Sequence, residues 1–231
     1  MVQQIIPPTT ETIIYPDSDG KPMADNTKQY QWIVKIKENL EILFASQPDV
    51  FIAGDLLWYP LQGSNKICQA PDIMVVFGIP KGDRGSYQQW KENNIAPQVV
   101  FEILSPGNTT QEMVRKLLFY QRYGVEEYYI YNPDTREFNG LLRYDEGLVE
   151  IEEVNGWISP RLGILFQVTS DNLEIYYPDH RKFLTSIELD QLLQTQTKRA
   201  EQEHQEKELA IQQYQQLLAK LQEKGIDIDS L

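Results

Sequence analysis

The spacing of apolar side chains predicts how the first part of the chain folds. Apolar residues recur at helical spacing over residues 29–44, after an N-cap at Asn26 or Thr27, which predicts an amphipathic helix. Two shorter apolar segments, 48–59 and 67–77, are typical of strands. The predicted order at this point is helix, strand, strand.

A continuous apolar run lies near the middle of the chain. Residues 98–104 read QVVFEIL, without the alternation of a half-exposed strand, which indicates a strand covered on both faces. A helix is predicted from about residue 108 to 123, ended by Gly124, and another strand at 125–132. Because a helix between two strands is a crossover connection, we expect these two strands to be parallel. Hairpin segments follow at 137–144, 148–152 and 162–175. The predicted fold class is α/β, a mixed β-sheet flanked by helices with extra antiparallel hairpins.

The composition changes near residue 187. Gln, Glu, Leu, Lys and Ala dominate from there to residue 224, with no Gly or Pro, which predicts a long C-terminal helix. One heptad stripe along it has the apolar members Leu189, Leu193, Ala200, Ala210, Tyr214, Leu217 and Leu221, and the polar members Gln196, Glu203 and Lys207. Two interpretations stay open, a solvated helix and a weak coiled coil that makes a homodimer. The predicted organisation is an extended arm at 1–25, a central domain at 26–185 and a helical tail at 186–231.

Composition and charge narrow the functional class. The chain has 231 residues and a formal net charge of -13, which disfavours a protein that coats nucleic acid. It leaves open an enzyme in which a bound cation bridges carboxylates and phosphate. Cys68 is the only cysteine and is expected to be a small core residue in a strand. With no disulfide, no signal-peptide pattern at the start and no apolar run of about 18 residues, we expect a cytoplasmic protein without a membrane partner.

Two acidic residues have no packing reason for their positions. Glu102 lies inside the buried run, where an ionised carboxylate costs several kcal/mol unless it is paired or bound to a metal. Asp72 follows Pro71 at the start of an apolar segment. The alternatives are a core glutamate satisfied by arginine or backbone groups, and an ordinary turn aspartate. If the two strands are neighbours, both carboxylates project from one end of the sheet. Oxygen-rich pairs of this kind suit Mg²⁺ or Mn²⁺, and the Ile103 carbonyl is a candidate third ligand.

Several basic residues are candidates for contact with phosphate. Lys116 lies on the predicted helix after Glu102, and its alternative role is a surface ion pair with Glu112, four residues earlier. The polar segment 78–96 supplies further cations, and aromatic residues that either stack on bases or belong to the core. The candidate nucleic-acid contacts are Lys81, Arg84, Lys91 and Arg115.

Two longer stretches carry a family resemblance. They are PDIMVVFGIPKGDRGSYQQWKE and APQVVFEILSPGNTTQEMVRKLLFYQRYGVEEYYIYNPD. They resemble the Uma-type family of restriction endonucleases, formerly a domain of unknown function, and the likeness runs from about residue 27 to 183. The helical tail ending GIDIDSL is also similar to tails of that family. The family is similar to the PD-(D/E)XK nuclease superfamily. The resemblance therefore implies a restriction-endonuclease-like domain at 26–185.

The resemblance assigns roles by position. Asp72 corresponds to the aspartate of PD, and Glu102 to the acid of (D/E)XK. The third letter departs, because Leu104 stands where the superfamily has lysine, and the resemblance implies that Lys116 replaces it from the helix. Asp55 matches a recurrent family position, as a further ligand or a turn residue, and is expected to have a supporting role. Glu38 or Glu41 of the first predicted helix is a candidate to approach the site, with a solvated face as the alternative, and Glu112 stands where family members often have Asp.

The sequence thus predicts a Mg²⁺- or Mn²⁺-dependent DNA endonuclease. Its catalytic residues are Asp72, Glu102 and Lys116, and its metal ligands are Asp72, Glu102 and the Ile103 carbonyl. The alternative is a catalytically inactive nuclease fold that serves as a binding or assembly module and dimerises through its C-terminal helix. The net charge and Leu104 favour this alternative, whereas the embedded Glu102 favours the enzyme.

Overall fold

A computed structural model describes residues 13–18, 26–145 and 147–223. The chain divides into two units, Met1–Phe183 and Leu184–Leu231. Most of the predicted arm, and the terminal GIDIDSL, lie outside the described residues. Of the arm, Tyr15 packs against Tyr59 and Trp90, with ring centroids 5.3 and 4.8 Å apart. This described part of the arm is therefore attached to the first unit.

A six-stranded mixed sheet forms the centre of the first unit. Its strand order is β1-β3-β5-β6-β7-β8. The strands are β1 (Val50–Gly54), β3 (Ile73–Phe77), β5 (Val99–Ile103), β6 (Glu127–Asn132), β7 (Glu137–Tyr144) and β8 (Gly147–Glu150). All neighbouring pairs are antiparallel except β5 and β6, which are parallel and joined through α2 (Thr110–Tyr123). The predicted mixed α/β fold and its crossover are confirmed.

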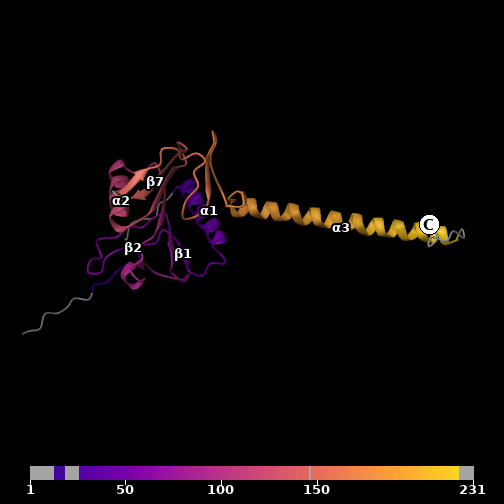
Figure 1. Ribbon diagram of the computed structural model, residues 1–231, viewed down its shortest axis with the longest axis horizontal. Helices are drawn as coiled ribbons and strands as arrows, with labels where there is room; N and C mark the ends of the chain where they lie inside the picture. The colour runs from indigo at the N-terminus through magenta and orange to yellow at the C-terminus, as the bar shows by residue number, and fades with distance from the viewer. Residues whose placement is uncertain (1–12, 19–25, 146, 224–231) are drawn as a thin grey trace, which may run out of the picture. The chain divides into compact units, whose positions relative to one another are not determined.

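Alternation along the strands gives the sheet two buried faces. Ile73 and Phe101 belong to one core, shared with α1 (Thr27–Leu43) and the hairpin of β9 (Leu165–Val168) and β10 (Leu173–Tyr176). Met74 and Val100 belong to the other core, shared with α2 and the parallel pair β2 (Trp58–Tyr59) and β4 (Tyr87–Gln88). The two helices lie on opposite sides of the sheet (Figure 1). Because both faces are covered, the central strands read as apolar runs.

Both helices of the first unit have the ends that the sequence predicts. Asn26 caps α1 by accepting a hydrogen bond from the Gln29 amide at 2.8 Å. Thr109 caps α2 in the same way, from the Glu112 amide at 3.2 Å. Gly124 ends α2 with φ +97°, a left-handed conformation that glycine adopts without steric cost.

Three local predictions differ from the structure. The strand predicted at 67–77 begins only at Ile73, so Asp72 immediately precedes β3. Cys68 is half-buried and outside the named strands, so its assignment to the core of a strand is wrong. The segment 78–96, expected from its polar sequence to be a long loop, contains β4 and a 3₁₀ turn at Gln89–Lys91. A two-residue strand leaves no readable period in the sequence.

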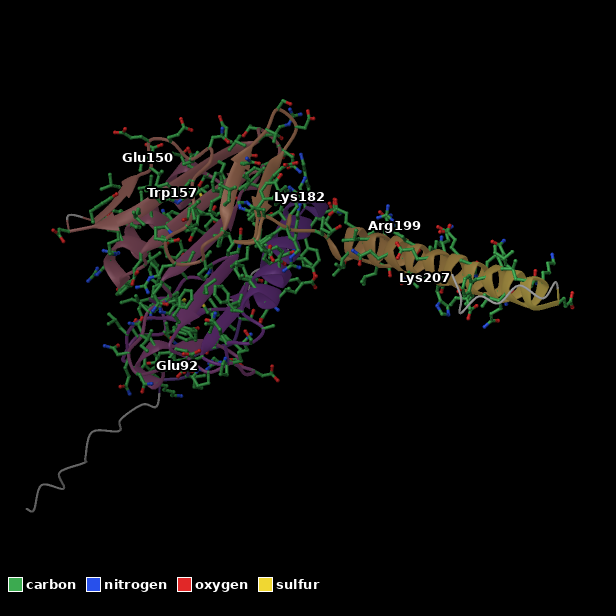
Figure 2. The ribbon with its side chains drawn as sticks, turned by 45° about the vertical axis from the view of Figure 1, so that its right-hand side comes forward. Glu92, Glu150, Trp157, Lys182, Arg199 and Lys207 are labelled. Atoms are coloured by element: carbon green, nitrogen blue, oxygen red, sulfur yellow. The ribbon has the colours of Figure 1, made fainter. Side chains whose placement is uncertain are left out.

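The second unit contains one long helix, α3 (Ser186–Glu223), drawn orange to yellow in Figure 1. Its side chains point outward on all sides of the helix, and Arg199 and Lys207 are two examples (Figure 2). Across the described residues, no helix combines the length and the apolar character that crossing a membrane requires.

Candidate active site

Strand pairing aligns the two predicted acids. Gly54 of β1 pairs with Ile73 of β3, and Ile73 pairs with Phe101 of β5. Both pairs are antiparallel, so continuing this register by one residue places Asp72, immediately before β3, opposite Glu102 of β5. Residues directly opposite in a sheet point to the same face, with Cβ atoms about 4.5–5.5 Å apart. The structure thus brings Asp72 and Glu102 together at one end of the sheet, on the face that α2 covers.

Asp72 is fixed by the neighbouring strands. Its Oδ2 accepts a hydrogen bond from the Ile103 amide at 2.6 Å. Its carbonyl accepts one from the Asp55 amide at 3.2 Å. Asp55 itself is exposed and has a positive φ of +49°, which turns the chain away from β1. These backbone contacts orient the Asp72 carboxylate toward the end of β5.

Glu102 is buried against α2, with 2% of its surface exposed. Lys116 Nζ donates to Glu102 Oε2 at 2.7 Å, and the Tyr120 hydroxyl donates to Oε1 at 2.5 Å. Both donors come from one face of α2, because residues four apart lie above one another on a helix. Burial raises the pKa of Glu102, and the charge and hydrogen bond of Lys116 and the hydrogen bond of Tyr120 oppose that rise.

Lys116 is a buried cation and not the surface ion pair that the alternative interpretation proposed. Burial acts to lower its pKa, but the charges of Glu102 and Asp72 outweigh burial and hold the pKa above its ordinary value. Glu112, in the first turn of α2, contributes in the same direction. Lys116 therefore stays protonated at neutral pH.

Three residues near the acids escaped the sequence-based prediction. Gln29 of α1 donates from Nε2 to the Ile103 carbonyl at 2.8 Å. Tyr120 is fully buried, and the sequence indicates only that it lies on a helix, four positions after Lys116. Tyr128 of β6 stacks edge-on to Tyr120 at 5.0 Å, and burial followed by the charges of Glu102 and Asp72 raises its pKa. Within the described ranges, the Tyr128 hydroxyl is buried without a hydrogen-bond partner.

The predicted supporting glutamate Glu41 lies elsewhere. It forms ion pairs with Lys37 and Lys81, at 3.5 and 3.3 Å. Twelve residues separate it from Gln29 on α1, which is about 18 Å along the helix axis. The structure does not bring Glu41 to the two acids.

The predicted nucleic-acid contacts differ in their availability. Arg84 binds Glu92 (labelled in Figure 2) through two hydrogen bonds of 2.7 and 3.3 Å, and its guanidinium carbon lies 4.1 Å from the Phe51 ring centroid. Lys91 and Arg115 are exposed. The Arg84 guanidinium is therefore engaged in contacts with Glu92 and Phe51, whereas Lys91 and Arg115 face solvent.

The candidate metal ligands at this end of the sheet are all oxygen atoms. It consists of the two carboxylates and the Ile103 carbonyl, which are hard ligands. Among the residues that the structure describes, no group of three or more His, Cys, Asp or Glu side chains is placed to hold a metal ion. Two carboxylates match a Mg²⁺ site, since Mg²⁺ keeps several waters.

Comparison with known proteins adds a family to this geometry. The family described as "Uma2: Putative restriction endonuclease" matches residues 19–171. The chain belongs to the Uma2 family. The resemblance stated from the sequence is confirmed, and the matched region includes both acids, Lys116 and the whole central sheet.

A solved structure also matches part of this chain. The structure is titled "Crystal structure of a putative nuclease belonging to DUF820 from Anabaena variabilis ATCC 29413 at 1.96 A resolution". Its sequence identity is 17% and its TM-score 0.45, covering 61% of this Uma2 chain and 74% of that chain. No match was found among the curated proteins.

Proposed function

We propose that this Uma2 protein is a cytoplasmic, metal-dependent DNA endonuclease whose site consists of Asp72, Glu102 and Lys116. The observation that carries the proposal is the alignment of the two carboxylates at the end of β3 and β5, with the Lys116 ammonium on Glu102. The family name supports nuclease chemistry, and the donor set supports Mg²⁺ or Mn²⁺.

The residues present fit such a cation. Asp72, Glu102 and the Ile103 carbonyl would hold it. An ionised carboxylate offers about four lone-pair positions, so the hydrogen bonds to Glu102 leave acceptor capacity for a metal. When bound, the cation would polarise the phosphodiester and lower the pKa of a bound water.

The protein's own groups would prepare the substrate. Lys116, held protonated by the neighbouring acids, is suited to contact a phosphate oxygen and to stabilise charge during hydrolysis. It is not suited to act as a general base, because its pKa is raised. Glu112 supports this charge state from the first turn of α2. In hydrolysis the oxygen of a water bonds to phosphorus and gives up a proton, while the bond from phosphorus to the leaving deoxyribose oxygen breaks and that oxygen gains a proton.

Nicking of supercoiled plasmid tests this function. The wild-type protein should nick DNA with Mg²⁺ or Mn²⁺, and not with EDTA. Lys116→Met should reduce nicking by about 10² or more, whereas Lys66→Met, at an exposed position outside the predicted nucleic-acid contacts, should change it little. Equal nicking by the wild type and Lys116→Met would remove Lys116 from the mechanism.

A second candidate function rests on a specific observation. Both Glu102 oxygens accept hydrogen bonds from α2, and Leu104 occupies the superfamily lysine position. A fold stabilised by this contact would serve as an inactive binding or assembly module. Absence of both metal binding and nicking in a folded wild-type protein would favour that candidate.

A further inference from the structure

The stripe of α3 has an internal symmetry. Its positions alternate in steps of four and three from Leu189 to Leu221, which is the spacing of a coiled-coil seam. Read from either end toward residue 205, three of the five equidistant pairs are identical residues, the central pair carries opposite charges, and Gln196 with Tyr214 does not match. The equidistant pairs are Leu189 with Leu221, Leu193 with Leu217, Gln196 with Tyr214, Ala200 with Ala210, and Glu203 with Lys207.

This symmetry has a consequence only when two copies run in opposite directions. In an antiparallel pair centred on residue 205, leucine meets leucine near both ends and alanine meets alanine farther in. At the centre, Glu203 of each copy meets Lys207 of the other. In a parallel pair, identical residues meet, so Glu203 would face Glu203 and Lys207 would face Lys207. Like charges on the seam oppose that arrangement.

The exposure of the seam shows that it is available. Leu193 and Leu217 are each 54% exposed, and Tyr214 is 62% exposed. Glu203 and Lys207 are also exposed, and Lys207 is labelled on the helix in Figure 2. The stripe spans 32 residue steps, about 48 Å of helix. A long helix with such a stripe is more stable when the stripe is covered.

We infer that α3 is the interface of a homodimer in which two copies pair antiparallel along this seam, with Glu203 and Lys207 forming reciprocal ion pairs at its centre. The polar residues in the middle then fix direction and register, a role that polar seam residues have in other coiled coils. The partner is a second copy of this chain, because the pattern is complementary to itself.

Charge exchange tests the intermolecular pairing. Glu203 and Lys207 are also four residues apart on one helix, so the test separates pairing within a chain from pairing between chains. In the full-length protein, Glu203→Lys places Lys against Lys in both central layers, and Lys207→Glu places Glu against Glu. Each variant alone should weaken dimerisation by about tenfold or more in sedimentation velocity. Co-expressing the two variants should restore a dimer of both chains. Failure of the mixture to recover would contradict the proposal.

Disulfide trapping tests the direction. The full-length protein with Cys68→Ser carries either Leu193→Cys or Leu217→Cys, and the two chains are co-expressed with different tags. Antiparallel pairing should yield disulfides between residue 193 of one chain and residue 217 of the other under a thiol–disulfide buffer. Neither variant alone should form a dimer disulfide, since equivalent positions lie about 36 Å apart along the helix axis. Disulfides between equivalent positions, or a wild-type monomer at all concentrations, would overturn the inference.

Discussion

Lys116 Nζ lies 2.7 Å from Glu102 Oε2, and the two side chains are only 10% and 2% exposed. The cation comes from α2 and the anion from β5, so the pair links the helix to the centre of the sheet. Burying either charge alone is costly, and the pair is therefore a condition of the local fold as well as of the proposed chemistry.

Removing the cation tests the pair as a stabilising contact. Among the described residues, Lys116→Met leaves Tyr120 as the remaining side-chain donor to the buried Glu102 carboxylate, and it should reduce the free energy of unfolding by about 3–5 kcal/mol at pH 7. Urea denaturation measures this change. The matched control Lys91→Met, at an exposed position, should stay within about 0.5 kcal/mol of the wild type. A loss below about 1 kcal/mol for Lys116→Met would show that the pair is not a main stabilising contact.

Two neighbouring tyrosines offer a matched comparison of one hydroxyl each. Both rings are fully buried, 5.0 Å apart, but only the Tyr120 hydroxyl donates to Glu102. Tyr120→Phe should cost about 1–3 kcal/mol, because it leaves a carboxylate oxygen without its donor. Tyr128→Phe should be neutral or stabilising, since it removes a buried hydroxyl that has no partner among the described residues. Equal losses in thermal unfolding would mean that ring packing, and not the hydrogen bond, decides both.

Glu127 is a second buried carboxylate, and we expect it to make the free energy of unfolding depend on pH. Glu127 accepts hydrogen bonds from the Tyr129 and Ser159 hydroxyls and the Arg161 amide. Burial nevertheless raises its pKa above the ordinary 4.5, with those hydrogen bonds opposing the rise. The folded state therefore binds this proton more tightly than the unfolded state does. Its contribution to stability falls as the pH increases from about 4.5 to the raised pKa.

Glu127→Gln isolates that contribution. The variant lacks the titrating proton, so its stability should fall less than that of the wild type over the same pH range. Urea denaturation at a series of pH values gives the difference between the two proteins. A difference that does not change with pH would contradict the raised pKa.

DNA binding should distinguish two of the predicted contacts, if the proposed function holds. Arg115→Ala removes an exposed cation one residue before Lys116 and should reduce the dependence of binding on salt by about one unit in the log–log slope. Arg84→Ala removes a cation already bound to Glu92, so it should leave the slope unchanged and cost about 1 kcal/mol of stability. Binding to duplex DNA in EDTA, where the proposed nuclease does not cut, is measured at several salt concentrations and gives the slopes. An altered slope for Arg84→Ala alone would reverse the assignment.

Sequence periodicity predicts those elements whose signal is local. The buried run of β5, the caps of α1 and α2 and the crossover between β5 and β6 all follow from short stretches of chain. Glu102 was recognisable because a charge inside such a run is costly. Asp72 was selected from the family resemblance and from the hypothesis that its strand neighbours that of Glu102, and the pairing of β3 with β5 confirms that the strands are neighbours.

Local sequence patterns could not predict contacts between elements that are distant in the chain. Gln29 reaches the Ile103 carbonyl across 74 residues, and nothing in the helical pattern of α1 marks it. Tyr120 reads as an ordinary aromatic of a helix until α2 is placed over Glu102. The half-buried position of Cys68 depends on where β3 begins, and strand boundaries are weakly encoded in sequence.

Calorimetric titration with Mn²⁺ tests the central claim, that Asp72 and Glu102 form a metal site, most directly. The wild-type protein should bind Mn²⁺, and the double variant Asp72→Asn, Glu102→Gln should lose that binding while remaining folded. Glu127→Gln, which removes a buried carboxylate outside the site, should bind as the wild type does. No Mn²⁺ binding by the folded wild type, or equal binding by the double variant, would contradict the assignment of these two acids.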